Sequence, residues 1–222
     1  MQFDVITLFP KVLEPYLNES ILGRAVRNNL ITVKLHNLRN FSRDKHKKVD
    51  DRQYGGGPGM VLQIKPIITA VTKVTVSKVT NKPKVIIFSA AGKQFDDKMA
   101  RRFAKEKSLV LVAGRYEGID ARVLKILKDQ GYKAEEVSIG PYILTGGEIP
   151  ALAVIDAVAR KIPGVLGKSE SLEEKRFGAG VPVYTRPEVF EYKGKKYRVP
   201  NALLSGHHKK IEEWRTKKRK LT

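Results

Sequence analysis

The sequence predicts an α/β fold with a mostly parallel sheet, followed by a small, mainly helical C-terminal domain. Runs of β-branched residues alternate with segments of helical spacing from Gln2 as far as Arg160, as in proteins built from β-α-β units. Three of these runs end in glycine-containing loops, over 85–92, 109–118 and 137–151. Because ligands bind beyond the carboxyl ends of parallel strands, the three loops predict one shared binding site.

The first third of the chain opens as a β-α-β unit. Gln2–Phe9 alternates apolar and polar residues and predicts a central strand, which Pro10 ends. A helix is expected over Lys11–Asn29, with a break near Pro15. Ile31–Leu38 is expected to form the next strand.

A long connection follows over Asn40–Gly59, which is polar, basic and rich in glycine. A loop of this length is typically functional or disordered. Its Tyr54-Gly-Gly-Gly-Pro-Gly segment predicts no regular element; it could bring backbone N–H groups near a phosphate or a base, or be a flexible loop. A helix is then expected over Lys65–Lys78, with Pro66 near its first turn.

The middle of the chain repeats the strand and helix alternation. Asp96 is expected to cap a helix at its N-terminus, because its carboxylate can accept a backbone N–H bond. The helix over Ala151–Ile162 is apolar almost all round, which predicts that it is buried or lies at a subunit interface. The remaining expected elements are strands over Val85–Ser89 and Leu109–Ala113 and helices over Asp96–Lys105 and Ile119–Asp129.

The chain is expected to have three parts: a ligand-binding domain over 1–162, a charged linker over 163–180 and a basic domain over 181–222. In the last part, Val189–Tyr192 and Tyr197–Val199 predict a hairpin. A helix is expected from about His207. Basic residues alternate there with Tyr184, Tyr192, Tyr197 and Trp214, a composition that suits single-stranded RNA loops.

The composition indicates a polyanionic partner or an acidic membrane surface. The net charge is +20, from 43 Lys and Arg against 23 Asp and Glu, and the excess recurs in 34–52, 186–198 and 209–220. Such spacing suits an extended phosphate backbone, although solvated surface lysines are the alternative. With no secretory leader, no apolar run of membrane-spanning length and no membrane partner expected, the chain is expected to be cytoplasmic.

Several classes of site are disfavoured by the residues. The chain has no cysteine, so disulfides and thiolate metal sites are excluded, and its four histidines lack the spacing of a metal site; no metal site is expected. The glycine signatures of dinucleotide-binding and nucleoside triphosphate-binding loops do not occur.

Four ordered motifs resemble one family. They are Asp51-Arg-Gln-Tyr-Gly-Gly-Gly-Pro-Gly-Met60, Gly114-Arg-Tyr-Glu-Gly-Ile-Asp120, Ser138-Ile-Gly-Pro-Tyr-Ile-Leu-Thr-Gly-Gly-Glu148 and Tyr184-Thr-Arg-Pro-Glu188. In this order they are similar to the bacterial tRNA (guanine-N1)-methyltransferases, of the knotted SPOUT class. The resemblance implies a C-terminal trefoil knot in the α/β domain and a homodimer. It also implies a reaction in which S-adenosylmethionine methylates a guanine of the tRNA anticodon stem-loop. The methyl group goes to N1 of the guanine that lies on the 3′ side of the anticodon.

The resemblance also implies the residues that bind the methyl donor. Ser89-Ala90-Ala91 stands where the family usually has Ser-Pro-Gln, and Pro141 where it usually has Asp, so one polar contact near the cofactor is in question. Glu117 could instead pair with Arg115 or Arg122. The expected cofactor-binding residues are Phe88, Ser89, Ala90, Gly114, Glu117, Ser138, Ile139, Gly140, Pro141, Tyr142, Ile143, Leu144, Gly146, Gly147 and Pro150.

The resemblance also implies catalytic residues, an arginine and a general base. Arg160 could cap the C-terminus of its helix, and it also matches the family's catalytic arginine. The family's catalytic aspartate falls on Lys175 when the sequences are aligned on Phe177, and an ammonium group cannot accept a proton. A shift of one residue makes Glu174 the expected general base, with Glu173 in reserve.

The resemblance and the charge pattern together imply the residues that contact tRNA. They are Tyr54, Gly55, Gly56, Gly57, Arg186, His207, Arg215, Lys217 and Arg219. Two alternatives stay open: a catalytically impaired RNA-binding homologue that has lost its base, and a SPOUT methyltransferase with another RNA target. The sequence leaves any divalent-ion requirement open.

Overall fold

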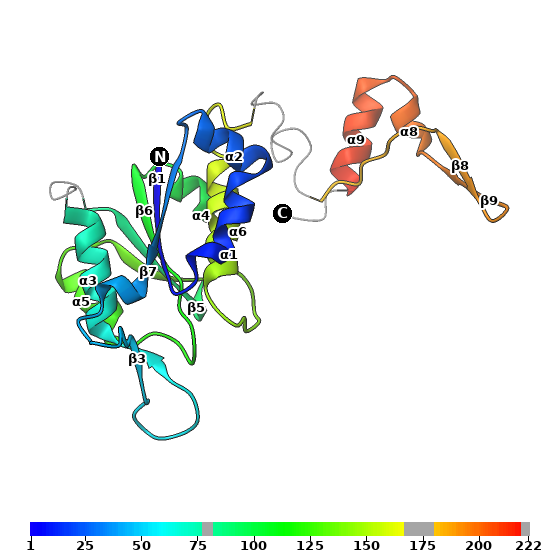
Figure 1. Cartoon of the computed structure of the whole chain (residues 1–222). Coiled ribbons are helices and arrows are strands. Elements are labelled where there is room, and N and C mark those ends of the chain that lie inside the picture. Colours follow the sequence, from blue (N-terminus) through cyan, green and yellow to red (C-terminus); the bar gives the residue numbers. More distant parts are fainter. Residues whose placement is uncertain (77–81, 167–179, 219–222) are drawn as a thin grey trace. The chain divides into compact units, whose positions relative to one another are not determined.

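The computed structural model describes residues 1–76, 82–166 and 180–218. The chain forms two compact units, Met1–Val165 and Leu166–Thr222. The first contains a sheet covered by helices, and the described residues of the second form a hairpin and two helices (Figure 1).

The sheet of the first unit has five strands, all parallel, in the order β2-β1-β6-β5-β7. This confirms the prediction of an α/β fold with a mostly parallel sheet. As expected, β1 lies inside the sheet, between β2 and β6. The strands span Gln2–Thr7 (β1), Thr32–Asn37 (β2), Lys84–Gln94 (β5), Ser108–Val112 (β6) and Ala134–Ser138 (β7).

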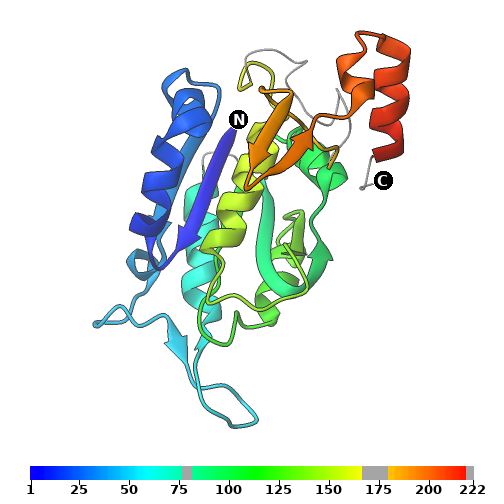
Figure 2. The same ribbon diagram turned by 90° about the vertical axis from the view of Figure 1, so that its right-hand side faces the viewer.

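Two hydrophobic cores lie on the two faces of this sheet. Alternate residues of one strand enter different cores: Ile86 packs in the first, and Val85 and Ile87 pack in the second. Burial on both faces explains why β6 and the first part of β5 are apolar almost throughout. Helices α1 (Pro10–Asn18), α2 (Ser20–Arg27), α4 (Asp97–Phe103) and α6 (Glu148–Ala159) cover the first face, and α3 (Ile64–Thr75) and α5 (Arg122–Asp129) cover the second (Figure 2).

The expected helix break near Pro15 is wrong. Pro15 lies inside α1, and the chain leaves helical conformation at Glu19 (φ −105°, ψ 161°) before α2 begins. Gly23 of α2 lies so close to the Asn18 carbonyl that a Cβ atom there would collide with it. The absence of a side chain at Gly23 therefore allows the two helices to meet at this corner.

Strand β5 is longer than the predicted Val85–Ser89. It reaches Gln94, and both Phe88 and Lys93 pair with Val137 of β7. The residues between them, 89–92, form a bulge, so the expected glycine loop is an interruption within a strand. Gly92 lies against the Val137 backbone, where a side chain would not fit.

The long polar connection has more structure than the sequence indicated. A 3-10 helix, η1, spans Leu38–Phe41, and β3 (Asp50–Asp51) pairs antiparallel with β4 (Val61–Leu62). Between these short strands, residues 52–60 form an outer loop with no regular element, as predicted for its Tyr54-Gly-Gly-Gly-Pro-Gly segment.

The second unit contains the predicted hairpin and terminal helix. Strand β8 (Val189–Tyr192) pairs antiparallel with β9 (Lys195–Arg198), and α9 spans His208–Lys218. A short helix, α8 (Asn201–Leu204), precedes α9 and was not predicted. Within the described ranges, no helix has the length and apolar character needed to cross a membrane.

The predicted N-cap of α4 is confirmed and can be tested by substitution. The Asp96 carboxylate accepts the Met99 N–H at 2.6 Å. Asp96→Ala is expected to lower the free energy of unfolding by about 1 kcal/mol, the usual value of an N-cap. Urea denaturation would measure the change, Asp96→Asn is the control that keeps an acceptor, and an unshifted midpoint in the alanine variant would contradict the role.

Candidate functional site

The bulged part of β5 and the loops after β6 and β7 meet around one cleft of about 450 Å³. These strands are parallel neighbours in the sheet, so their carboxyl ends lie at the same edge. The cleft is lined by residues from these strand ends, from the loops that follow them and from the start of α6, namely residues 87–91, 114–119, 136–140, 142–144, 146–147 and 150.

Gly147 fixes how closely two of these loops approach. Its N–H donates to the Gly114 carbonyl at 2.8 Å. A Cβ atom at Gly147 would lie 2.6 Å from the Ala113 Cα and 2.8 Å from the Gly114 nitrogen, which are backbone atoms that cannot rotate away. Glycine is therefore required here by packing.

A buried ionic cluster supports the floor of the cleft. Glu148 is 1% exposed; its carboxylate accepts the Thr7 hydroxyl at 2.6 Å and lies 2.9 Å from Arg115 Nε. Arg115 also donates to the Thr145 carbonyl at 3.2 Å and lies 4.6 Å above the Phe9 ring. The cluster joins the end of β1 to two cleft loops, and loss of one buried charge would leave the other without a counter-charge.

The outer loop is attached to the cleft through its last residues. Glu117 N–H donates to the Met60 carbonyl at 3.0 Å, and Leu62 N–H donates to the Gly118 carbonyl at 3.0 Å. Gly59, at φ +93°, lies against the Glu117 side chain, with room for no Cβ atom. The end of the outer loop therefore packs on a residue that lines the cleft.

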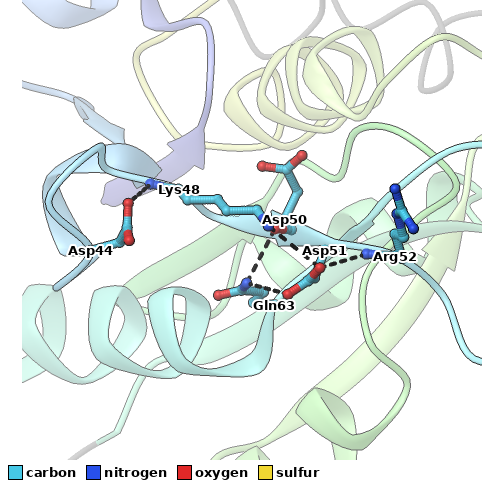
Figure 3. Close-up of polar contacts among 6 residues, drawn as sticks. All are labelled: Asp44, Lys48, Asp50, Asp51, Arg52 and Gln63. Atoms are coloured by element: carbon cyan, nitrogen blue, oxygen red, sulfur yellow. Dashed lines mark hydrogen bonds and ion pairs between the residues drawn. The ribbon is translucent and has the colours of Figure 1, made fainter.

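The other end of the outer loop is held by polar contacts (Figure 3). Lys48 Nζ lies 3.4 Å from Asp51 Oδ1, and Gln63 donates to the Asp50 carbonyl at 3.1 Å. The N–H of Arg52 donates to Asp51, and together with Lys48 it holds the pKa of the Asp51 carboxyl below its usual value. These contacts fix the start of the loop, and inside the loop the Gln53 side chain donates to the Gly56 carbonyl at 2.8 Å.

The structure brings the expected cofactor-binding residues together. All of them except Pro141 line the cleft. Three apolar side chains there are open to a ligand: Tyr142 is 52% exposed, Ile143 91% and Leu144 41%. Pro141 lies between lining residues but does not itself face the cleft.

The expected catalytic arginine lies away from the cleft. Arg160 is the C-cap of α6, about 18 Å along the helix axis from Glu148 at a rise of 1.5 Å per residue. In the described part of the chain it does not line the cleft that the start of α6 helps to form. Glu173 and Glu174 lie outside the described residues.

The expected tRNA-contacting residues fall in both units. Tyr54 is 97% exposed at the outer loop, and the three following glycines all have positive φ. Arg186, His207 and Lys217 are exposed in the second unit, where Arg215 is partly covered and lies 3.8 Å from Glu212. Arg219 lies outside the described residues.

Sequence reasoning left out several residues that line the cleft. Arg115, Tyr116, Gly118 and Ile119 belong to the same glycine motif as Gly114 and Glu117. Tyr116 has φ +60°, unusual for a tyrosine, and is 47% exposed. The sequence could have indicated Tyr116 as a cleft residue, because it lies between Gly114 and Glu117, which were both predicted to line the site. Its strained backbone is visible only in the structure. Over the described ranges, no cluster of three or more His, Asp or Glu side chains is arranged to hold a metal ion.

Comparison with known proteins gives consistent matches over the full length. The family model described as "tRNA (Guanine-1)-methyltransferase TrmD" matches residues 1–222. Similar proteins named tRNA (guanine-N(1)-)-methyltransferase include one from Clostridioides difficile, 44% identical over 97% of this chain and 90% of its own length. Those from Ruminiclostridium cellulolyticum and Haemophilus influenzae are each 47% identical, over 97% and 98% of this chain and 89% and 85% of their own lengths.

Proposed function

The chain belongs to the tRNA (guanine-1)-methyltransferase family, and we propose that it transfers the methyl group of S-adenosylmethionine to N1 of the guanine 3′ to the anticodon. The observation that carries this proposal is the family match over all 222 residues. The family match favours methylation of this guanine in tRNA over the two alternatives, an impaired RNA-binding homologue and an enzyme with another RNA target.

The cleft is compatible with the methyl donor. Its volume of about 450 Å³ falls in the range typical of small-molecule sites, roughly 300–1,000 Å³. Exposed apolar side chains, such as Ile143, suit the face of a purine ring. Backbone N–H and carbonyl groups at the glycine-rich strand ends suit its polar edge.

The reaction needs two contributions from the chain's own residues. S-adenosylmethionine would supply an electrophilic methyl group, whose bond to the sulfonium sulfur breaks to leave S-adenosylhomocysteine. Guanine N1 carries a proton at neutral pH, so a base must accept that proton as the N–C bond forms, and we assign this role to Glu174, with Glu173 in reserve. Arg160 would hold the negative charge that develops on the guanine O6 atom.

We further propose the homodimer and the trefoil knot that characterise the family. The position of Arg160, at the opposite end of α6 from the cleft, supports a site completed by a second copy. Residues 1–162 would bind the methyl donor, 163–180 would link the domains, and 181–222 would bind the anticodon stem-loop. Light scattering at micromolar concentration checks the dimer, which a monomer mass would overturn.

A methylation assay tests the proposed function directly. The purified protein is incubated with labelled S-adenosylmethionine and a tRNA transcript carrying guanine 3′ to the anticodon, and the modified base is mapped. Label at N1 of that guanine is expected, with none in a transcript carrying adenine there. Tight tRNA binding without label would indicate the impaired homologue, and label at another position would indicate another target.

Binding of tRNA is expected to depend strongly on salt, with Lys217 contributing. Lys217 is exposed near the end of α9, so Lys217→Gln removes a cation that can displace a counterion from a phosphate. The slope of log K against log salt is expected to become shallower by up to about 0.7–0.9. Lys217→Arg is the charge-matched control, and an unchanged slope in the glutamine variant would mean that Lys217 is only solvated.

A further inference from the structure

The hairpin of the second unit sorts its side chains onto two different faces. In the β8–β9 register, Phe190 lies opposite Tyr197, and Tyr192 lies opposite Lys195. Residues directly opposite each other share a face, as do residues two apart on one strand. One face, here called the aromatic face, therefore carries Phe190, Tyr192, Lys195 and Tyr197.

The reverse face is polar. It carries Val189, Glu191, Lys196 and Arg198, which pair as Val189 with Arg198 and Glu191 with Lys196. All but the partly buried Val189 are exposed. This polar face provides a matched comparison for the aromatic one on the same two strands.

The aromatic face is exposed to solvent although it carries three large aromatic side chains. Phe190 is 56% exposed, Tyr192 55% and Tyr197 50%. An isolated two-stranded hairpin is at best marginally stable in water. Three half-exposed rings on one side of such a ribbon indicate a surface that a partner covers.

The turn gives the ribbon a defined shape. Lys193 has φ +49° and Gly194 φ +73°, and two consecutive positive φ values fit the two-residue turn whose twist matches that of the strands. The Val199 N–H donates to the Glu188 carbonyl at 2.9 Å, extending the pairing beyond β8 and β9. The ribbon of β8 and β9 (Figure 1) is therefore a short, regular scaffold for the rings.

The charge around the rings identifies the partner. The hairpin carries four cations against the single carboxylate of Glu191. Lys193 Nζ lies 5.5 Å from the centre of the Tyr192 ring, and Lys195 Nζ lies 5.6 Å from that of Tyr197. A ring beside an ammonium group can stack on a nucleobase while the cation contacts the adjoining phosphate.

We propose that the aromatic face of the hairpin stacks on unpaired bases of the bound tRNA. The inference rests on the proposed function, because it specifies how the same RNA is held. Aromatic rings recognise a base face of any sequence, so this contact would add affinity without selecting a base. A second protein copy is disfavoured because the same positive charges would face one another across the contact.

The test measures binding of a tRNA transcript to the full-length protein, without methyl donor, across a range of salt concentrations. Tyr197→Val removes the ring and retains a residue that favours strands. Loss of one stacked base corresponds to roughly 5- to 150-fold weaker binding. The slope of log K against log salt should stay unchanged, because no cation is lost.

Two further variants separate stacking from charge and from folding. Tyr197→Phe keeps the ring and is expected to bind like the unmodified protein. Lys196→Gln, on the polar face, should at most reduce the salt slope. The proposal would be overturned if Tyr197→Val bound tRNA within about twofold of the unmodified protein, or if Tyr197→Phe lost as much affinity as Tyr197→Val. It would also be overturned if light scattering showed a change of mass in Tyr197→Val, because the aromatic face would then bind another copy of the protein. Because no methyl donor is present, failure of methylation and failure of stacking remain distinguishable.

Discussion

Glu174→Gln is expected to slow single-turnover methylation of tRNA by roughly 10²–10⁴-fold, the usual cost of losing a general base. Glutamine has the size and hydrogen-bonding reach of glutamate, but its amide cannot accept the guanine N1 proton. Affinities for tRNA and S-adenosylmethionine should stay close to those of the unmodified protein, since only proton transfer is affected. Rapid-quench measurement with enzyme in excess isolates this step from product release.

Glu173→Gln is the matched control, because it removes an adjacent carboxylate in the same sequence context. A rate within about twofold of the unmodified protein is expected for it. If Glu174→Gln retains its rate and Glu173→Gln loses it, the base is Glu173. If both single variants and the double variant retain their rates, neither glutamate accepts the proton.

Gly147→Val is expected to abolish S-adenosylmethionine binding measured by calorimetry. The added side chain would meet the backbone of Ala113 and Gly114, so the loops after β6 and β7 would have to separate. Overpacking of this kind typically costs about 1–3 kcal/mol, and the unfolding midpoint in urea should fall accordingly. The effect on binding arises because the cleft is built from these same two loops.

Gly56→Ala is the control for this prediction. No atom lies within 4 Å of the position that its Cβ would take, so no contact of the cleft changes; an alanine is strained at the Gly56 φ of +80°, but S-adenosylmethionine affinity should be unaffected. Normal affinity in Gly147→Val would show that the methyl donor binds elsewhere. Gly146→Val would act differently, because its side chain would meet Arg115 and Glu148 and disturb the ionic cluster.

The sheet and most of the cleft were predictable because their signals are local. The runs over 85–88 and 109–112 are buried on both faces and therefore apolar almost throughout. Parallel strands must end at one edge, so the glycine loops that follow them had to meet. Pro141 was the exception, since a motif of consecutive residues does not tell which of them faces the cleft.

The remaining features depend on contacts between distant residues. Strands β3 and β4 have two residues each, too few for a periodic pattern, and the backbone of Leu62 pairs with Gly118 and Asp120 far along the chain. The Glu148 carboxylate is buried where Thr7, at the end of β1, and Arg115, in the loop after β6, reach it. In the sequence alone, Glu148 is an ordinary acidic residue at the start of a helix.

The strand order also constrains how the chain folds during synthesis. β1 is made first, and it pairs with β2 early, but its other neighbour is β6, where Phe3 lies opposite Leu109. Until β6 leaves the ribosome, one edge of β1 has no partner and can pair with other chains. Contacts between such distant residues are slow to form. The nascent first unit is therefore expected to depend on protection from aggregation until β6 has left the ribosome.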